Sequence, residues 1–353
     1  MNNLIMIPKK RTIKTIKKNM SIRQFYKIRN KVLIIRDGGG IGDILMLRMI
    51  VEDFKILMPE AEITVAVPPG YCQLLENHPF IDKIENSREL NENEYMLSYN
   101  VTNACVRYEM KIAPMSDMHR SDIWAAHCGV KLTKHNMYLS ITREYKEYAV
   151  KLFDHIGLKK RPIVCFSPSS STPSKDLDLN QINEIVNWIK ALDFEIFILH
   201  KDNIEGANCR TINGITLKQW LAIINQSDYV ITVDTGTLHA AQGFNKPTVA
   251  IFSWADGDTY CKYHENCTIV QRHRKNGDWS CGPCYAWQNC VKCPSHQELR
   301  KPCITEITGK EVLEAFKQRH LVYIRQLSWE SLSMNQNHDR WMINIQNLVF
   351  QIH

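Results

Sequence analysis

Short, fully apolar segments alternate with longer amphipathic segments along this chain, and that alternation restricts the possible folds more than any other feature. The first apolar segment, Val32 to Ile35, is followed by a glycine-rich turn, a helical pattern and the strand pattern AEITVAV. A second series starts at RPIVCFS and continues through FEIFILH, YVITVD and PTVAIFS. Strands that are apolar at every position are typical of parallel sheets buried on both faces. Two such series predict an α/β fold with two doubly wound parallel sheets.

The length and the uneven charge of the chain indicate how these parts are arranged. A chain of 353 residues is long enough for two domains with their own cores. We predict one domain at 31–155 and another at 156–316, preceded by a basic arm at 1–30 and followed by a partly helical tail at 317–353. Residues 1–31 contain ten lysines and arginines and no acidic residue, whereas the whole chain has a net charge of only +7. The arm could lie on an anionic membrane, contact nucleic acid, or be a solvated tail.

The N-terminus lacks the pattern of a secretion signal. Its apolar run, Leu4 to Ile7, ends at Pro8 and is too short for the apolar region of a signal peptide. No other segment approaches the ~18 consecutive apolar residues of a membrane span. We therefore expect a cytoplasmic protein, with peripheral binding to the inner face of the membrane as a further option. Its twelve cysteines are expected to be free thiols or metal ligands.

The turn after the first strand is the first candidate site. Its glycines, where the backbone can approach a ligand closely, are Gly38, Gly39, Gly40 and Gly42. A dinucleotide-binding fingerprint would require a glycine where Asp43 stands and an acid after the second strand, and both are missing. The carboxylate of Asp43 is expected to face the crevice at the carboxyl edge of the sheet. The simpler interpretation is an acid that stabilises a helix N-terminus through the helix dipole.

Two turns of the second series suit a diphosphate. One follows the strand YVITV and offers a carboxylate, helix N-terminal amides, hydroxyls and an imidazole. Its residues are Asp234, Thr235, Gly236, Thr237 and His239. The other, SPSSSTPSK, combines the hydroxyls of Ser169, Ser170 and Ser171 with the ammonium of Lys175, although it could also be an ordinary surface turn. Two such turns at equivalent strand ends of one sheet favour a phosphate site.

Three segments together resemble glycosyltransferase family 9, the ADP-heptose:lipopolysaccharide heptosyltransferases. They read GIGDILMLRMIVEDFKILMPEAEITVAV, HPFID and DYVITVDTGTLHAAQGFNKPTVAIFS, and the resemblance covers roughly residues 31 to 316. It implies the GT-B architecture, in which two Rossmann-like domains face a cleft. The acceptor would bind the first domain and the nucleotide-diphosphate sugar the second. The implied activity is inverting transfer of a heptose-like sugar from ADP-heptose to a hydroxyl of a glycan, a lipid-linked or a protein acceptor, without a catalytic metal ion.

The resemblance also assigns roles to individual positions. It implies that Asp43 is the catalytic base and that Glu205 holds the nucleotide ribose. The implied contacts to the donor sugar and diphosphate are Ser170, Ser171, Lys175, Asp234, Thr235, Gly236, Thr237 and His239. This chain departs from the family in two respects: Asp176 follows Lys175 where the family has an aromatic residue, and the basic arm lies outside the family core.

A cysteine-rich insert, residues 281–303, predicts a structural zinc or iron site. Its cysteines are Cys281, Cys284, Cys290, Cys293 and Cys303. Paired CxxC turns at short spacing are typical of tetrahedral metal sites, and four thiolates leave no open position for catalysis. The two pairs alone would use Cys290. Resemblance to the iron-binding heptosyltransferases of autotransporters implies Cys303 in its place.

Two other functions are compatible with these patterns. An enzyme of the same fold could add a sugar to a modified nucleic-acid base and use the basic arm for phosphate contacts. A non-catalytic protein could use the cysteine knuckle as a recognition module. The first should bind nucleic acid in a salt-dependent way, and the second should neither hydrolyse nor transfer any nucleotide sugar.

Overall fold

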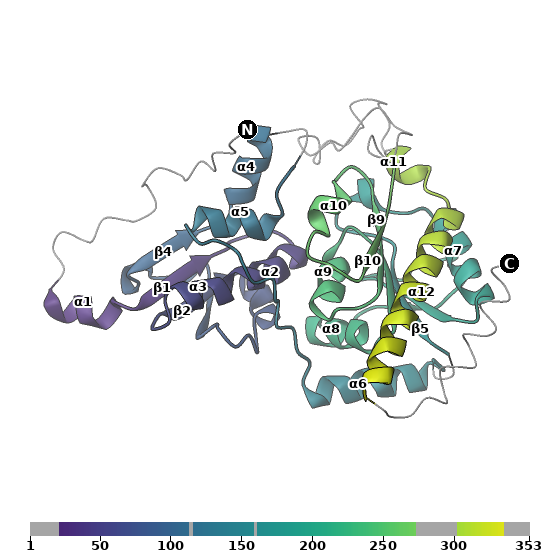
Figure 1. Ribbon diagram of the computed structural model, residues 1–353, viewed down its shortest axis with the longest axis horizontal. Coiled ribbons are helices and arrows are strands. Elements are labelled where there is room, and N and C mark those ends of the chain that lie inside the picture. Colours follow the sequence, from purple (N-terminus) through teal and green to yellow (C-terminus); the bar gives the residue numbers. More distant parts are fainter. Residues whose placement is uncertain (1–20, 113–115, 159–160, 273–301, 335–353) are drawn as a thin grey trace.

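The computed structural model describes residues 21–112, 116–158, 161–272 and 302–334, and within them the chain forms two parallel sheets (Figure 1). The first, ordered β3-β2-β1-β4, consists of β1 (Lys31–Ile35), β2 (Glu62–Val67), β3 (Lys83–Asn86) and β4 (Leu97–Asn100). The second, ordered β10-β9-β8-β5-β6-β7, consists of β5 (Ile163–Ser167), β6 (Glu195–Leu199), β7 (Thr211–Ile212), β8 (Tyr229–Val233), β9 (Thr248–Phe252) and β10 (Cys267–Gln271). All paired strands run parallel, which confirms the predicted α/β class.

Helices cover the faces of both sheets. Around the first sheet lie α2 (Ile41–Leu47), α3 (Val51–Leu57), α4 (Ala104–Ile112) and α5 (Arg120–His127), and α1 (Ile22–Ile28) precedes β1. The second sheet carries α7 (Leu179–Ala191), α8 (Leu217–Gln226), α9 (Gly236–Gly243), α10 (Gly257–Tyr260), α11 (Pro302–Thr305) and α12 (Gly309–Met334). Between the sheets in sequence, α6 (Arg143–His155) packs against α8. We call the first sheet with α2 to α5 the first lobe, and the second sheet with α7 to α12 the second lobe.

The order of the strands sets where a ligand can bind. In the first sheet β1 pairs with β2 on one side and with β4 on the other, and in the second sheet β5 lies between β6 and β8. Loops leave such neighbouring strands in opposite directions, and the crevice between them is the usual ligand site of parallel sheets. The glycine turn follows β1, and Asp234 directly follows β8. Both candidate turns therefore lie at a switch point of their sheet.

The helix after the glycine turn is interrupted, where the sequence pattern predicts a continuous one. A 3-10 turn at Arg48–Ile50 separates α2 from α3. The fully buried Arg48 side chain donates to the carbonyl oxygens of Leu74, Glu76, Met137 and Tyr138. Within the described chain no carboxylate pairs with it. Arg48 thus joins α2 to the segment that leads from the first lobe towards the second.

Replacing Arg48 with methionine is expected to lower the free energy of unfolding by about 3 kcal/mol, because several buried carbonyls lose their donor. Urea denaturation followed by circular dichroism measures the change. Arg143→Met is the matched control, since the Arg143 side chain is 93% exposed. A loss for Arg48→Met no larger than that of the control would contradict the structural role.

The C-terminal helix continues into the segment predicted as a partly helical tail, 317–353. It begins at Gly309 and ends at Met334. No glycine or proline occurs between these two ends, so the chain contains no residue that would stop the helix. In Figure 1 α12 lies along the second lobe, where it contacts α7, β9 and β10. The greater part of the basic arm and the end of the C-terminal tail lie outside the described residues.

Candidate active site

The glycine turn is shaped by the side chains that it must accommodate. Gly38 and Gly39 have φ angles of 129° and 91°, which side-chain-bearing residues rarely adopt. A Cβ at Gly39 would lie 2.5 Å from both Arg36 and Asp43. Glycine at this position therefore lets the backbone pass beside a buried ion pair.

Asp43 lies in the first turn of α2 and is held on both carboxylate oxygens. Arg120 Nη1 donates to Oδ1 at 2.7 Å, while Oδ2 accepts from the Gly40 amide at 3.0 Å and lies 3.2 Å from Arg36 Nη2. Burial alone would raise the pKa of this carboxyl, but the two guanidinium groups and the amide outweigh it and lower the pKa to about 2. Asp43 is thus an ionised, hydrogen-bonded carboxylate rather than a simple helix-dipole acid.

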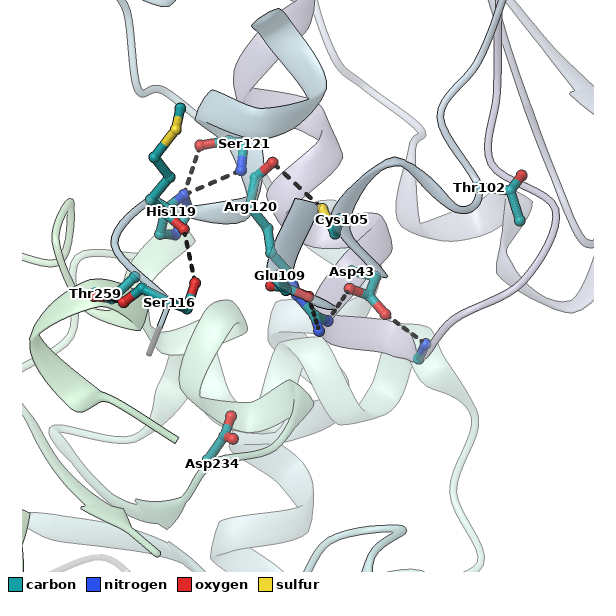
Figure 2. Close-up of polar contacts among 12 residues, drawn as sticks. Asp43, Thr102, Cys105, Glu109, Ser116, His119, Arg120, Ser121, Asp234 and Thr259 are labelled. Atoms are coloured by element: carbon teal, nitrogen blue, oxygen red, sulfur yellow. Dashed lines mark hydrogen bonds and ion pairs between the residues drawn. The ribbon is translucent and has the colours of Figure 1, made fainter. Parts of the chain in front are cut away.

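Arg120 and Glu109 complete this cluster, and sequence reasoning missed both. Arg120 also donates from Nε and Nη2 to the two oxygens of Glu109, at 3.1 and 3.3 Å. Glu109 lies on α4 and is fully buried, and Figure 2 shows it joined through Arg120 to Asp43. Glu109 and Asp43 are 66 positions apart in the chain, so local spacing contains no signal that one arginine would bind both. An acid within a mainly apolar stretch is the only sequence signal that could have indicated Glu109.

The second lobe contributes a buried cation–carboxylate pair at the end of β8. Lys175 Nζ donates to Asp234 Oδ2 at 2.6 Å and lies 4.7 Å from the centre of the Trp254 ring. Burial disfavours the charge of Asp234, yet the adjacent Lys175 holds its pKa below the ordinary range. Ser167 Oγ and Thr237 Oγ1 are 2.9 Å apart, which ties β5 to the first turn of α9.

The two lobes meet where α2 approaches α9. A Cβ at Gly42 would lie 2.5 Å from His239 Cδ2, and a Cβ at Gly236 would lie 3.0 Å from Ile41 Cγ2. Glycine in both helices therefore permits their close approach. Burial lowers the pKa of His239 to about 4, so its imidazole is neutral at neutral pH. Among the described residues, its buried Nδ1 has no hydrogen-bond partner.

One cavity of about 740 Å³ joins these elements. Of the residues predicted from sequence, those that line it are Gly39, Gly40, Gly42, Asp43, Ser169, Ser170, Ser171, Lys175, Asp234, Thr235, Gly236, Thr237 and His239. Figure 2 shows Asp43 and Asp234 on ribbons of different lobes. Gly38 and Glu205 are not among its lining residues, and Glu205 is exposed. In the loop after β6, His200 and Lys201 reach the cavity instead.

The cavity has further walls that sequence reasoning did not predict. Aromatic side chains of Tyr71, Trp220, Trp254 and Tyr260 line it, together with Arg120. Aromatic and apolar surface beside a few charged groups is typical of sites that bind a nucleotide. The cavity thus has a carboxylate on the side of the first lobe and a lysine with hydroxyls on the side of the second. These groups can interact with opposite ends of a group that is transferred between two molecules.

The cysteine cluster falls largely outside the described residues. Cys281, Cys284, Cys290 and Cys293 are among these undescribed positions, and Cys303 lies half-buried on α11. In the described parts of the chain, no three His, Cys, Asp or Glu side chains are placed to hold a metal ion. Likewise, no helix of the described chain is long and apolar enough to cross a membrane.

This arrangement of two parallel sheets around a shared cavity is that of the two-lobed glycosyltransferases. The family model described as glycosyltransferase family 9 (heptosyltransferase) matches residues 97–284. The chain therefore belongs to glycosyltransferase family 9 and is a glycosyltransferase of the heptosyltransferase type. No curated protein matches it by sequence.

Solved structures share its fold at low sequence identity. ADP-heptose lipopolysaccharide heptosyltransferase II of E. coli is 18% identical, with a TM-score of 0.61 over 83% of this chain and 99% of that one. A family 9 glycosyltransferase of Veillonella parvula is 15% identical, with a TM-score of 0.64 over 84% and 98%. The iron-containing dodecameric glycosyltransferase TibC of enterotoxigenic E. coli is 17% identical, with a TM-score of 0.63 over 84% and 77%.

Proposed function

We propose that this protein transfers a heptose-like sugar from ADP-heptose to an acceptor hydroxyl with inversion at the anomeric carbon. The observation that carries the proposal is the shared cavity, in which Asp43 of the first lobe faces the pair of Lys175 and Asp234 in the second. TibC, one of the structures of similar fold, has been solved in complex with ADP-D-beta-D-heptose. The first domain, 31–155, would bind the acceptor, and the second, 156–316, the donor.

The proposed reaction is a single displacement. The acceptor oxygen attacks the anomeric carbon while Asp43 takes its proton, and the bond from that carbon to the diphosphate oxygen breaks to release ADP. A well-placed general base contributes about 10²- to 10⁴-fold to the rate. Lys175, the hydroxyls of Ser170 and Ser171, and the amides at the start of α9 would stabilise the negative charge that develops on the diphosphate. His239 and Asp234 would contact the donor sugar.

The acceptor would approach through the switch point of the first sheet. A polar cavity next to the glycine turn is lined by Asp37, Asn100, Thr102, Asn103 and Arg107. Amides, a hydroxyl, a carboxylate and a guanidinium are groups that bind sugar hydroxyls and nearby anions. This supports a glycan, a lipid-linked glycan or a glycosylated protein surface as the acceptor. The basic arm would assist if the acceptor were held at an anionic membrane.

A structural zinc or iron ion on the cysteine insert is also part of the proposal. Cys303 is the one insert cysteine in the described chain, and it packs against the cluster of Cys261 and Tyr260 beside the cavity. A zinc or iron ion bound by cysteine thiolates at this position would anchor the insert to the second lobe. Cys281, Cys284 and Cys293 would complete the site with Cys303, or Cys290 would take the place of Cys303. TibC is described as iron-containing.

A thermal-shift panel tests the donor. ADP and ADP-heptose at about 100 times their Kd should stabilise the protein by about 2.7 kcal/mol, because a ligand of the folded state shifts unfolding by mass action. UDP, GDP and CDP at equal concentration serve as controls for the base. A melting temperature unchanged by ADP and ADP-heptose, or raised equally by all four diphosphates, would contradict an ADP-sugar donor.

A further inference from the structure

We propose that Arg120, anchored on Glu109, is a positioning residue that orients Asp43 and couples it to the approach of the second lobe. The inference rests on the proposed role of Asp43 as the base. It concerns how that base is held, and it assigns Arg120 no contact with the substrate.

Glu109 holds the guanidinium of Arg120 in place independently of Asp43. Two of its nitrogens bind the two oxygens of Glu109, so the plane of the guanidinium is set by a fully buried carboxylate (Figure 2). The third nitrogen, Nη1, then points to Asp43 Oδ1. A fork of this kind defines both the position and the orientation of a carboxylate, which a single ammonium does not. The remaining lone pairs of Asp43 stay available for the proton of an attacking hydroxyl.

The second lobe holds the same segment of α5 from the other side. The Tyr260 ring lies 5.5 Å from the Arg120 guanidinium carbon, in cation–π contact. Two residues further along α5, Asp122 accepts hydrogen bonds from Lys262 and Tyr263, both at 2.8 Å. The start of α5 therefore carries both the arginine of the active site and an attachment to the second lobe. A separation of the lobes would release the attachment and loosen Arg120.

A third contact extends this attachment beyond the helix. Thr259 Oγ1 donates to the Ser116 carbonyl at 3.2 Å, just before α5, and both residues appear in Figure 2. Residues 259–263 thus touch the first lobe on either side of Arg120. Contacts on both sides resist rotation of α5 as well as translation, so the approach of the second lobe adds to the hold that Glu109 has on Arg120.

The charges around Asp43 predict what removal of Arg120 does. The groups around Asp43 are Arg36 from the end of β1, Arg120 from α5 and the neutral His239 from α9. The thiol of Cys105 on α4 is also near, and burial raises its pKa, so it stays uncharged. Behind Arg120 lies Glu109 of α4. Without Arg120, Arg36 would be the cation left beside Asp43, and this carboxyl would bind a proton more readily.

The experiment compares Arg120→Met, Arg120→Lys and the exposed control Arg143→Met. ADP release from ADP-heptose, with water as the acceptor, is measured between pH 3 and pH 9. In Arg120→Met we expect a lower rate and an acidic limb between about pH 3 and pH 5, because the Asp43 pKa of about 2 should rise by about 1 to 3 units when one opposite charge is lost. Arg120→Lys should recover part of the shift, and Arg143→Met should behave like the wild type.

Carbon-13 NMR of aspartate-labelled protein gives a readout that needs no turnover. The Asp43 carboxyl signal, identified by its absence in Asp43→Asn, should not titrate above about pH 3 in the wild type, and should titrate between about pH 3 and pH 5 in Arg120→Met. Should Arg120→Met not fold, Arg120→Gln is measured in the same way, because glutamine also removes the charge and keeps a polar side chain.

The outcomes separate this inference from the proposed function. An unchanged pH profile and an unchanged Asp43 titration in the Arg120 variants would overturn the positioning role even if Asp43→Asn is inactive. A wild-type protein that neither binds ADP-heptose nor releases ADP from it would instead refute the proposed function, and the Asp43 titration would still decide whether Arg120 controls this carboxyl.

Discussion

Replacing Asp43 with asparagine should lower the rate of sugar transfer by about 10²- to 10⁴-fold, because the attacking hydroxyl loses its proton acceptor. Asparagine keeps the shape of the side chain, so the affinity for the donor should stay close to that of the wild type. Release of ADP measured by a coupled assay gives the rate, and calorimetry gives the donor affinity. Full activity in Asp43→Asn would remove Asp43 as the base.

The lowered pKa of Asp43 predicts the pH dependence of the wild-type enzyme. The pKa of Asp43 is about 2, below the ordinary 3.8, so the carboxylate remains ionised down to about pH 3. The rate should therefore show no acidic limb from Asp43 between pH 4 and pH 9. Asp193→Asn, at an exposed position on the second lobe, is the matched control and should leave the profile unchanged. An Asp43-dependent limb near pH 6 in the wild type would contradict the observed charge environment.

Lys175→Met should affect both activity and stability. The ammonium of Lys175 is expected to stabilise the leaving diphosphate, and its loss should lower kcat by about 10²- to 10³-fold. It also leaves Asp234 buried without its cation, which should lower the free energy of unfolding by about 3 kcal/mol. Asp234 is ionised in the wild type because Lys175 lowers its pKa. In the variant burial would raise that pKa, so the stability deficit should be largest at neutral pH and shrink as the pH falls.

A double variant separates the two effects of this substitution. Asp234→Asn combined with Lys175→Met removes the unpaired charge, so most of the lost stability should return. The activity should not return, because the diphosphate still lacks its cation. Urea denaturation and the ADP-release assay measure the two quantities on the same samples. A double variant that regains activity would show that Lys175 acts only on Asp234.

The repeated strand pattern was sufficient to predict the fold class and a part of the candidate site. Apolar strands followed by glycine or hydroxyl turns predicted the parallel sheets, and hence that Asp43 and Asp234 would lie at carboxyl ends of strands. The starts of α8 and α7 are also local features, because Thr216 and Asp178 form capping boxes there. These features depend on neighbouring residues, which is why they can be read in order along the chain.

Other parts of the site depend on contacts between distant residues. The helix of Asp43 gives way to a 3-10 turn at Arg48, whose side chain binds four carbonyls from two later segments, and no local residue predicts the break. Glu205, assigned to the ribose by resemblance, is exposed in a loop whose His200 and Lys201 line the cavity. The course of a loop is set by what it packs on, which a sequence pattern does not specify.

By itself the sequence determined that two parallel sheets would form, with a carboxylate at the edge of one and a turn rich in hydroxyls and amides at the edge of the other, since strand burial and turn chemistry act over a few residues. The tertiary structure alone decided that these edges share one cavity. It also decided that Asp43 is ionised between Arg36 and Arg120, with Glu109 behind them. Electrostatic contacts of this kind act through space between residues that folding brings together, so their strength depends on burial and distance and not on position along the chain.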